Sequence, residues 1–222
     1  MKLKSAILQV CAIALLSASL CSARAEVVRY QGQAGGSKVQ INGTSTIHEW
    51  MVEGKIITGG IEFDSSALPA SGATPDLNLA ALKANPKVEA TILVRTLKSA
   101  NPTMDNVMYQ HMKMVQFPKI EYRMTAWTLK EAPKTPGAPA QFDTTGELTI
   151  AGVKRTVKMP VTINSAEKDH LKVKGQTDLK MTDFGIQPPA PSLGLGLVKT
   201  GDDVKISFEW NTALKPAATA AK

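Results

Sequence analysis

The residues with the most evident chemical potential are three methionines and a histidine. Met104, Met108 and Met112 recur at every fourth position, and His111 precedes the last of them. This spacing places the thioethers on one face of a helix. Thioether and imidazole groups suit Cu(I), so the segment could serve a copper-handling or stress-protective module. The same face could instead pack over an apolar surface as a lid, because methionine fits irregular contacts.

His48, two residues before Trp50, is a second candidate polar group. We expect it at the mouth of a cavity, although a lone histidine is more often structural. The three histidines form no HExxH pattern, and both cysteines precede residue 22, so no zinc or nucleophilic constellation is evident. The sequence therefore predicts a protein that is not an enzyme, with no catalytic residue, no metal site and no cofactor.

The first 25 residues have the composition of a cleaved signal peptide. Lys2 and Lys4 precede an apolar run, and Ala23-Arg24-Ala25 has the small-residue pattern of a cleavage site. We therefore predict a signal peptide over residues 1–25, export of the protein, one domain over residues 26–214 and a disordered tail over residues 215–222. The mature chain would contain no cysteine and hence no disulfide.

The charge balance argues against nucleic acid as a partner. The whole chain has 26 Lys and Arg against 19 Asp and Glu, and loss of Lys2, Lys4 and Arg24 leaves 23 basic residues, a net charge of +4. The basic residues are scattered along alternating segments and are not interleaved with exposed aromatics. We expect no nucleic-acid binding.

Alternation of apolar and polar residues dominates the rest of the chain. It is clearest in Thr144–Ile163, where two alternating arms flank a short turn at Ala151–Arg155 and predict a β-hairpin. Pro160 cannot donate a ladder hydrogen bond, so its arm should be irregular there or pair on one side only. A break in phase at Ile57, followed by Gly59-Gly60, predicts a bend or bulge.

Roughly eight one-sided strands with a single short helix near residues 103–114 must fold over on themselves. A helix of this size cannot cover such a sheet, so the chain should form a barrel or a sandwich. The inward phase is rich in Val, Ile, Ala, Gly, Leu and Met, and few aromatics are available to fill it. This composition favours a barrel that holds a ligand, with a tightly packed core as the alternative.

Four stretches carry a resemblance to the YceI-like family. They are Thr44–His48, Asn106–His111 with Phe117–Ile120, Gly146–Val153 and Asp183–Ile186. The resemblance implies an all-β, lipocalin-like eight-stranded antiparallel β-barrel in the bacterial periplasm, enclosing a polyisoprenoid or similar amphipathic lipid such as a quinone. The loops near residues 65–85 and 131–140 depart from the family pattern.

On this basis we expect storage or transport of the lipid by enclosure. We also expect transient contact with a membrane surface and a monomer or homodimer. The predicted cavity lining is Ile41, Val52, Ile56, Val88, Ile92, Val94, Ile120, Tyr122, Met124, Leu148, Ile150, Val157, Met159, Leu179, Met181, Ile206 and Phe208. The predicted mouth or lid residues are His48, Met104, Met108, His111 and Met112.

Overall fold

The computed structural model describes residues 27–64, 85–135, 138–165, 167, 169–190 and 198–215. The predicted signal peptide lies outside these residues, as does most of the loop near residues 65–85. The predicted tail also lies outside them, apart from Lys215, which is the last residue of a strand.

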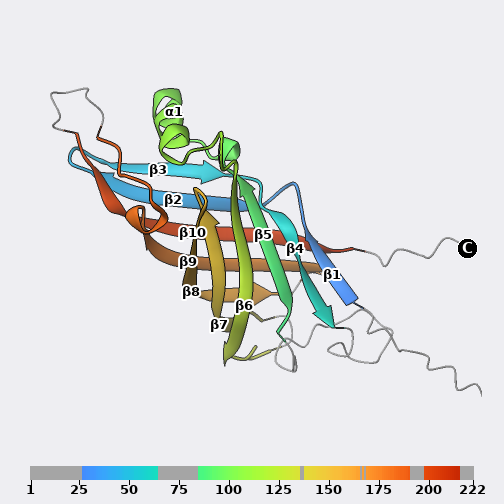
Figure 1. Cartoon of the computed structure of the whole chain (residues 1–222). Helices are drawn as coiled ribbons and strands as arrows, with labels where there is room; N and C mark the ends of the chain where they lie inside the picture. Colours follow the sequence, from blue (N-terminus) through green and yellow to red (C-terminus); the bar gives the residue numbers. More distant parts are fainter. Residues whose placement is uncertain are drawn as a thin grey trace, which may run out of the picture.

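Strands dominate the described part of the chain (Figure 1). The strands are β1 (Val27–Gly32), β2 (Lys38–Ser45), β3 (Glu49–Gly54), β4 (Thr58–Asp64), β5 (Lys87–Leu93), β6 (Lys119–Glu131), β7 (Ala140–Ile150), β8 (Val153–Asn164), β9 (His170–Lys180) and β10 (Thr200–Lys215). The helical elements are α1 (Pro102–His111) and two short 3-10 turns, η2 (Val94–Thr96) and η3 (Thr182–Phe184).

The sheet closes on itself. β1 pairs with β4 on one side and with β10 on the other, which completes an antiparallel ring in the order β1-β4-β5-β6-β7-β8-β9-β10. β2 pairs with the first part of the long β10, and β3 pairs with β2. The β2–β3 hairpin thus extends the wall beyond the ring, and the predicted eight-stranded antiparallel barrel with one short helix is confirmed.

The wall bends where the sequence loses its alternation. β3 ends at Gly54 and β4 begins at Thr58, which confirms the predicted break around Ile57. Gly59 follows with a φ of 118°, and a Cβ at this position would collide with the carbonyl oxygen of Glu89 on β5. Only glycine allows so close an approach in this conformation.

The predicted hairpin is formed by β7 and β8, although its turn is shorter than the predicted Ala151–Arg155 because β8 already begins at Val153. Their pairing runs from Ala140–Ile163 to Ile150–Val153, and Ala151 and Gly152 make the turn with φ angles of 49° and 80°. Two positive φ angles give the twist that a two-residue hairpin turn needs. Pro160 pairs with β7, whereas pairing between β8 and β9 begins only at Val161. Pro160 therefore pairs on one side only, as predicted.

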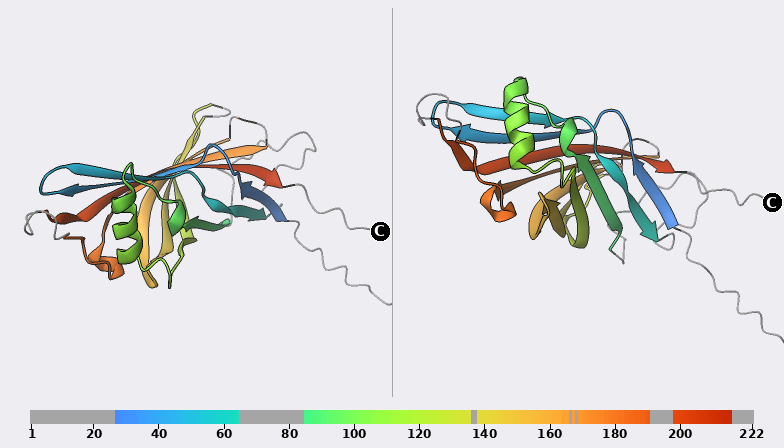
Figure 2. Two further views of the ribbon diagram at one scale, coloured as in Figure 1. Left: turned by 90° about the horizontal axis from the view of Figure 1, so that it is seen from above. Right: turned by 45° about the horizontal axis from the view of Figure 1, so that its top comes forward.

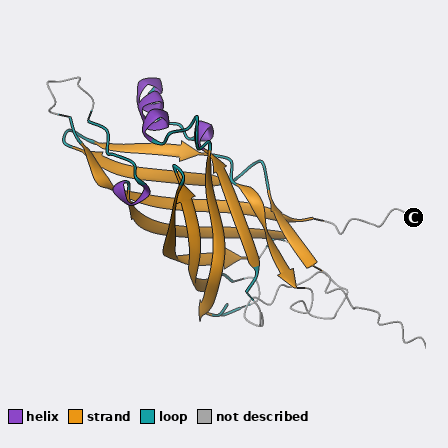
Figure 3. Ribbon diagram, in the orientation of Figure 1, coloured by secondary structure: helices purple, strands orange, loops and turns teal. Residues whose placement is uncertain are grey.

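The helical segments gather at one end of the barrel (Figure 3). α1 begins after Asn101, whose side chain accepts hydrogen bonds from the N–H groups of Thr103 and Met104. It ends three residues before the predicted limit at Met114, because Lys113 takes a φ of 54° and Met114 N–H bonds back to Tyr109. This is a Schellman end. No described helix is long and apolar enough to cross a bilayer.

Candidate functional site: an apolar cavity in the barrel

The inner faces of the strands and one face of α1 enclose a cavity of about 470 Å³. Pockets for small ligands are typically about 300–1,000 Å³. The wall draws on every strand of the ring except β1, together with β2 and β3. The cavity is therefore a property of the whole barrel.

The wall consists mainly of aliphatic side chains on the inward phase of the strands. All but two of the predicted lining residues lie on it: Ile41, Val52, Val88, Ile92, Ile120, Tyr122, Met124, Leu148, Ile150, Val157, Met159, Leu179, Met181, Ile206 and Phe208. Most of them are only half-buried although they point inward. They are not covered by neighbours because open space lies in front of them.

Ile56 and Val94 lie outside this wall. Ile56 falls in the bend between β3 and β4 and is 41% exposed on the outside, while its neighbour Ile57 lines the cavity. Val94 is buried in η2 because β5 ends one residue earlier, at Leu93. In both places the alternating sequence pattern continues beyond the end of the strand.

Lining residues of two kinds were not predicted from the sequence. Ile61, Trp127, Thr144, Thr177 and Trp210 lie on strands, and the same alternation would have found most of them. Leu97, Val107, Phe184 and Ile186 come from helical turns and loops. No periodicity marks the loop positions, since only tertiary packing turns them inward.

Aromatic side chains close one end of the cavity. Trp127 lines the cavity and stacks on Phe142 with ring centroids 4.2 Å apart, and Tyr30 meets Phe63 edge-on at 6.0 Å. Trp210 donates from Nε1 to the carbonyl oxygen of Ile57 at 3.1 Å. These contacts form a floor, which we define as Trp127 and Trp210 with Tyr30, Phe63 and Phe142 behind them.

α1 lies across the other end, beside the β2–β3 hairpin (Figure 2). Met104, Met108 and Met112 all line the cavity, as does Val107. The packed Met face was one of the two interpretations of this spacing, and the structure places it over the barrel interior.

Polar contacts fix α1 to the segment that precedes it. Tyr109 donates from its hydroxyl to the carbonyl oxygens of Leu97 and Arg95 at 2.7 and 3.1 Å. Asp105, whose side chain is 7% exposed, accepts hydrogen bonds from the backbone N–H and the hydroxyl of Ser99 and pairs with Lys98 at 3.4 Å. Burial alone would raise the pKa of Asp105, but the hydrogen bonds from Ser99 and Lys98 outweigh it and lower that pKa.

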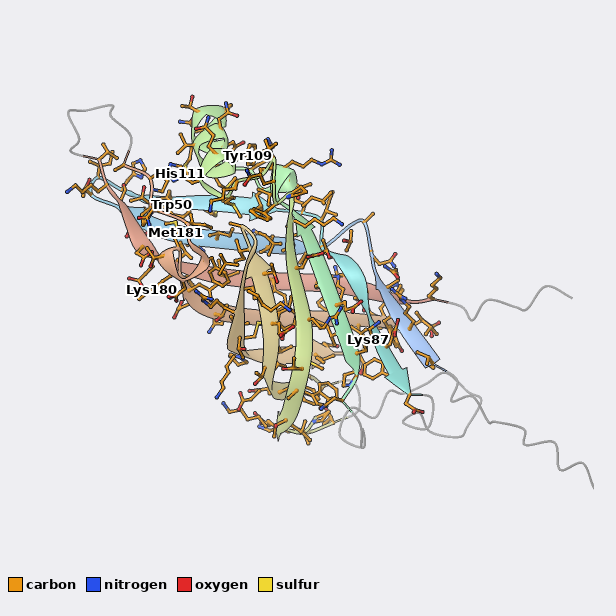
Figure 4. All side chains as sticks on the ribbon, in the orientation of Figure 1. Trp50, Lys87, Tyr109, His111, Lys180 and Met181 are labelled. Atoms are coloured by element: carbon orange, nitrogen blue, oxygen red, sulfur yellow. The ribbon has the colours of Figure 1, made fainter. Side chains whose placement is uncertain are left out.

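The most exposed lining residues lie at the α1 end and define the mouth. They are His48 on the β2–β3 turn, Asn101 and Thr103 at the start of α1, and Lys180 at the end of β9. Figure 4 shows Trp50, His111, Lys180 and Met181 gathered toward this end, with Lys87 far from it. The predicted mouth residues His48 and His111 both belong to the lining.

The charge at the mouth is largely neutralised. Lys180 is the only charged side chain among the described lining residues, and it pairs with Asp203 at 2.8 Å. That hydrogen bond and the nearby Asp202 and Asp183 raise the pKa of Lys180, so it stays protonated and paired. His111 Nδ1 lies 2.8 Å from the carbonyl oxygen of Gln187 and, because a carbonyl oxygen can only accept, Nδ1 donates this hydrogen bond.

Few polar groups lie deeper in the cavity. Thr144 donates its hydroxyl to the carbonyl oxygen of Met159 at 2.9 Å, and the Tyr122 hydroxyl lies beside Thr144. The Tyr122 oxygen is enclosed without a well-formed hydrogen bond to any described residue, and burial raises its pKa. The interior thus presents an apolar surface with its polar groups concentrated at the mouth.

The copper interpretation of the Met segment stays a prediction. The cavity is bordered by all four residues of this segment: Met104, Met108, His111 and Met112. One ring nitrogen of His111 is already hydrogen-bonded to the carbonyl oxygen of Gln187. Among the described residues no three His, Cys, Asp or Glu side chains are grouped so that they could hold a metal ion.

A profile of the YceI-like domain matches residues 30–212, which covers most of the chain and all of the cavity wall. The chain belongs to the YceI-like family. A direct comparison with curated proteins gives no match. The resemblance inferred from four short motifs is therefore confirmed over the full domain.

Solved structures show the same YceI-like fold at low sequence identity. A polyisoprenoid-binding domain from Saccharophagus degradans is 11% identical with a TM-score of 0.63, over 84% of this chain and 98% of that one. BcnA from Burkholderia cenocepacia is 19% identical with a TM-score of 0.56, over 79% and 95% of the two chains. A YceI protein from Campylobacter jejuni is 19% identical with a TM-score of 0.50, over 75% and 85%.

The YceI-like stretches of this chain all lie near the mouth. They form the β2–β3 turn (Thr44–His48), α1 and the loop after it (Asn106–His111 and Phe117–Ile120), the end of β7 with its turn (Gly146–Val153), and η3 with the residue beyond Gly185 (Asp183–Ile186). η3 also packs against β8 beside the region where β8 and β9 are unpaired. In this chain the motifs therefore shape the cavity entrance, and Phe184 helps to seal the wall.

Proposed function

We propose that the protein is a non-enzymatic periplasmic carrier that encloses an amphipathic lipid with an isoprenoid or similar tail. The observation that carries the proposal is the cavity itself, which is apolar over most of its wall, closed by the floor and most polar at its mouth. The Saccharophagus degradans relative is a polyisoprenoid-binding domain, which supports the same class of ligand for this chain. Storage or transport then needs no chemistry beyond enclosure.

Burial of the tail supplies the affinity. Each CH₂ group removed from water contributes about 0.8 kcal/mol, so one five-carbon unit contributes several kcal/mol before the costs of ordering the tail and the protein. Apart from the hydroxyl groups of Tyr122 and Thr144, the deeper wall offers few hydrogen-bond partners to a tail. Such a site selects for length and width more than for functional groups.

The apolar interior and the polar mouth determine how the ligand is oriented in the cavity. The tail lies toward Trp127 and Trp210, and the head lies between His48, His111 and Lys180. Because Lys180 is already paired with Asp203, the mouth has no free cation for a phosphate among its described residues, and an uncharged head such as a quinone fits it better.

The export of the protein rests on its sequence. A basic start, an apolar run and Ala23-Arg24-Ala25 are typical of a cleaved signal, and Cys11 and Cys21 would leave with it. A mature chain without cysteine folds independently of the redox state of its compartment. We place the carrier in the periplasm on these grounds.

The three tryptophans of the chain provide the assay, because Trp50, Trp127 and Trp210 all line the cavity. A quinone that enters should quench their fluorescence in delipidated protein. We expect saturable quenching by a polyprenyl-tailed quinone and at least 10-fold weaker binding of a polyprenyl phosphate with the same tail. Quenching that stays linear with quinone concentration would remove the proposal.

The matched variants are Ile150→Asp and Thr149→Asp. Ile150 lines the cavity, whereas Thr149 is on the opposite face of β7 beside Lys154. A carboxylate on the wall should abolish binding and reduce stability, because an unpaired charge is costly in an apolar space. Thr149→Asp should bind like the wild type, and equal binding by both variants would place β7 outside the ligand site.

A further inference from the structure

The loop from Lys113 to Lys119, between α1 and β6, presents apolar side chains to solvent. Val115 is 94% exposed and Phe117 is 37% exposed, so two large apolar groups stand on one short loop. Val115 has the largest exposed fraction among the described large hydrophobic side chains. A single exposed residue of this kind is ordinary. A pair on one fixed loop beside a cavity mouth indicates a surface that binds another molecule or a membrane.

The loop is held in shape by its own hydrogen bonds. The N–H groups of Gln116 and Phe117 both bond to the carbonyl oxygen of Lys113, at 2.9 and 2.8 Å. The Phe117 ring lies against Gly152 in the β7–β8 turn, where a Cβ would come within 2.5 Å of it. The loop, the turn and the first residues of β8 therefore form one surface, which we call the docking patch: residues 113–119 and 151–155.

The docking patch is basic as well as apolar. Lys113, Lys119, Lys154 and Arg155 are exposed on it, and only Lys154 has an ion-pair partner among the described residues, Glu147 at 3.0 Å. The sequence contains no acidic residue from position 106 to 120 or from position 149 to 162. Glu121 and Glu147 are the nearest acids along the two strands. Unpaired cations around exposed apolar groups are the combination that binds anionic bilayers.

The patch continues directly into the cavity wall. His111 and Met112, just before the loop, line the cavity, and so does Ile150, just before the turn. A ligand that leaves through the mouth would therefore meet whatever surface the patch contacts. If the cargo has a long apolar tail, passage into a bilayer avoids exposing that tail to water.

We propose that the docking patch seats the mouth of the barrel on an anionic lipid bilayer. Val115 and Phe117 enter the headgroup region, and Lys113, Lys119 and Arg155 face anionic head groups. The purpose of this contact, delivery and loading of lipid, rests on the proposed function. The contact itself does not, because it can be measured on protein without cargo.

The absence of cysteine after position 21 allows a direct test. The mature protein with Val115→Cys, carrying an environment-sensitive fluorophore and stripped of lipid, is mixed with phosphatidylethanolamine–phosphatidylglycerol vesicles. We expect a several-fold rise in emission, with no rise for phosphatidylcholine vesicles. The matched control is Val27→Cys at the other end of the barrel, where a 55% exposed valine should give no change.

Vesicle flotation of unlabelled protein completes the test. Val115→Ser, and separately the double change Lys113→Ser with Lys119→Ser, should reduce binding at least fivefold. Val27→Ser and Lys134→Ser should leave it unchanged, since these exposed residues lie away from the patch. Unchanged thermal unfolding of the patch variants would show that folding is intact.

No binding of the wild type to anionic vesicles, or wild-type binding by both patch variants, would overturn the proposal. Because the vesicles are offered to lipid-free protein, failure here leaves the quinone titration unaffected, and failure of that titration leaves the docking result valid. A patch that instead binds a protein partner would appear as no vesicle binding.

Discussion

The two ends of the barrel are built from the same alternating strands but are filled differently. At the closed end, Tyr30, Phe63 and Phe142 are each 2% exposed and pack in aromatic pairs. At the mouth end, strand residues such as Ile120 and Leu148 are only half-buried although they point inward. The closed end therefore has the packing of a protein core, and the mouth end has the open space of a container.

This difference assigns separate tasks to the two ends. Large rings give the closed end its stability, since aromatic residues bury more area than any others. The mouth end is covered by methionines on α1, which is fixed mainly by Asp105, Tyr109 and their hydrogen bonds. Stability and ligand capacity should thus respond to mutations at opposite ends of the barrel.

The largest expected effect comes from the floor. Phe142→Ala removes the ring that stacks on Trp127 and should lower the free energy of unfolding by about 3–5 kcal/mol. Met108→Ala at the mouth, where the side chain is half-buried, should cost much less. Urea unfolding of the two variants measures the contrast, and equal losses would mean that the two ends are packed alike.

Two substitutions that enlarge a side chain test whether the closed end is packed and the cavity is open. Ala140 is fully buried at the closed end, so Ala140→Leu should destabilise by about 1–3 kcal/mol through overpacking. Ala90 faces the open cavity, so Ala90→Leu should leave stability nearly unchanged and weaken quinone binding. A destabilised Ala90→Leu protein with normal binding would show that the cavity is filled by its own side chains.

The lid should respond to acid. The folded pKa of Asp105 is lowered, so its contribution is fully present above the unfolded pKa near 3.8 and is lost as the pH falls through the lower folded value. Amide exchange in α1 should therefore accelerate in wild-type protein only below about pH 4. Asp105→Asn should show fast exchange already at pH 7.

The control for this experiment is Asp143→Asn. Asp143 is an exposed carboxylate on β7, 3.7 Å from Lys130, and does not touch α1. Its loss should leave α1 exchange unchanged at every pH. Slow exchange of α1 in Asp105→Asn at pH 7 would show that Asp105 does not hold the lid.

The smallest effect concerns the methionines. Met108→Leu with Met112→Leu keeps their volume, so quinone affinity should change less than threefold. Cu(I) titration of the same pair separates packing from metal binding. A large loss of copper affinity in the double variant would revive the metal interpretation of this segment.

Alternation made most of the fold and the cavity wall predictable. Residues such as Ile150 and Val157 are apolar at every second position because one face of each strand looks inward. Pro160 also indicated its one-sided pairing, since it lacks an N–H group. Alternation gave wrong predictions at strand ends. Ile56 and Val94 continue the apolar alternation in sequence, but the strands β3 and β5 end before them.

The floor could not be predicted from local sequence. Trp127 and Phe142 stack because β6 and β7 pair in one register, and a single sequence does not reveal register over such a distance. Phe184 could not be predicted either, because the 3-10 turn η3 directs its side chain into the cavity. The barrel with its apolar inner face could therefore be predicted from sequence periodicity, whereas the aromatic floor is seen only in the structure.

Native mass spectrometry of the protein, purified gently from a periplasmic extract, tests the central claim most directly. We predict a bound species whose mass is that of one amphipathic lipid with an isoprenoid or similar tail. It should be lost in Ile150→Asp and retained in Thr149→Asp. Wild-type protein that carries no lipid, and takes up none when a polyprenyl-tailed quinone is supplied, would contradict the account.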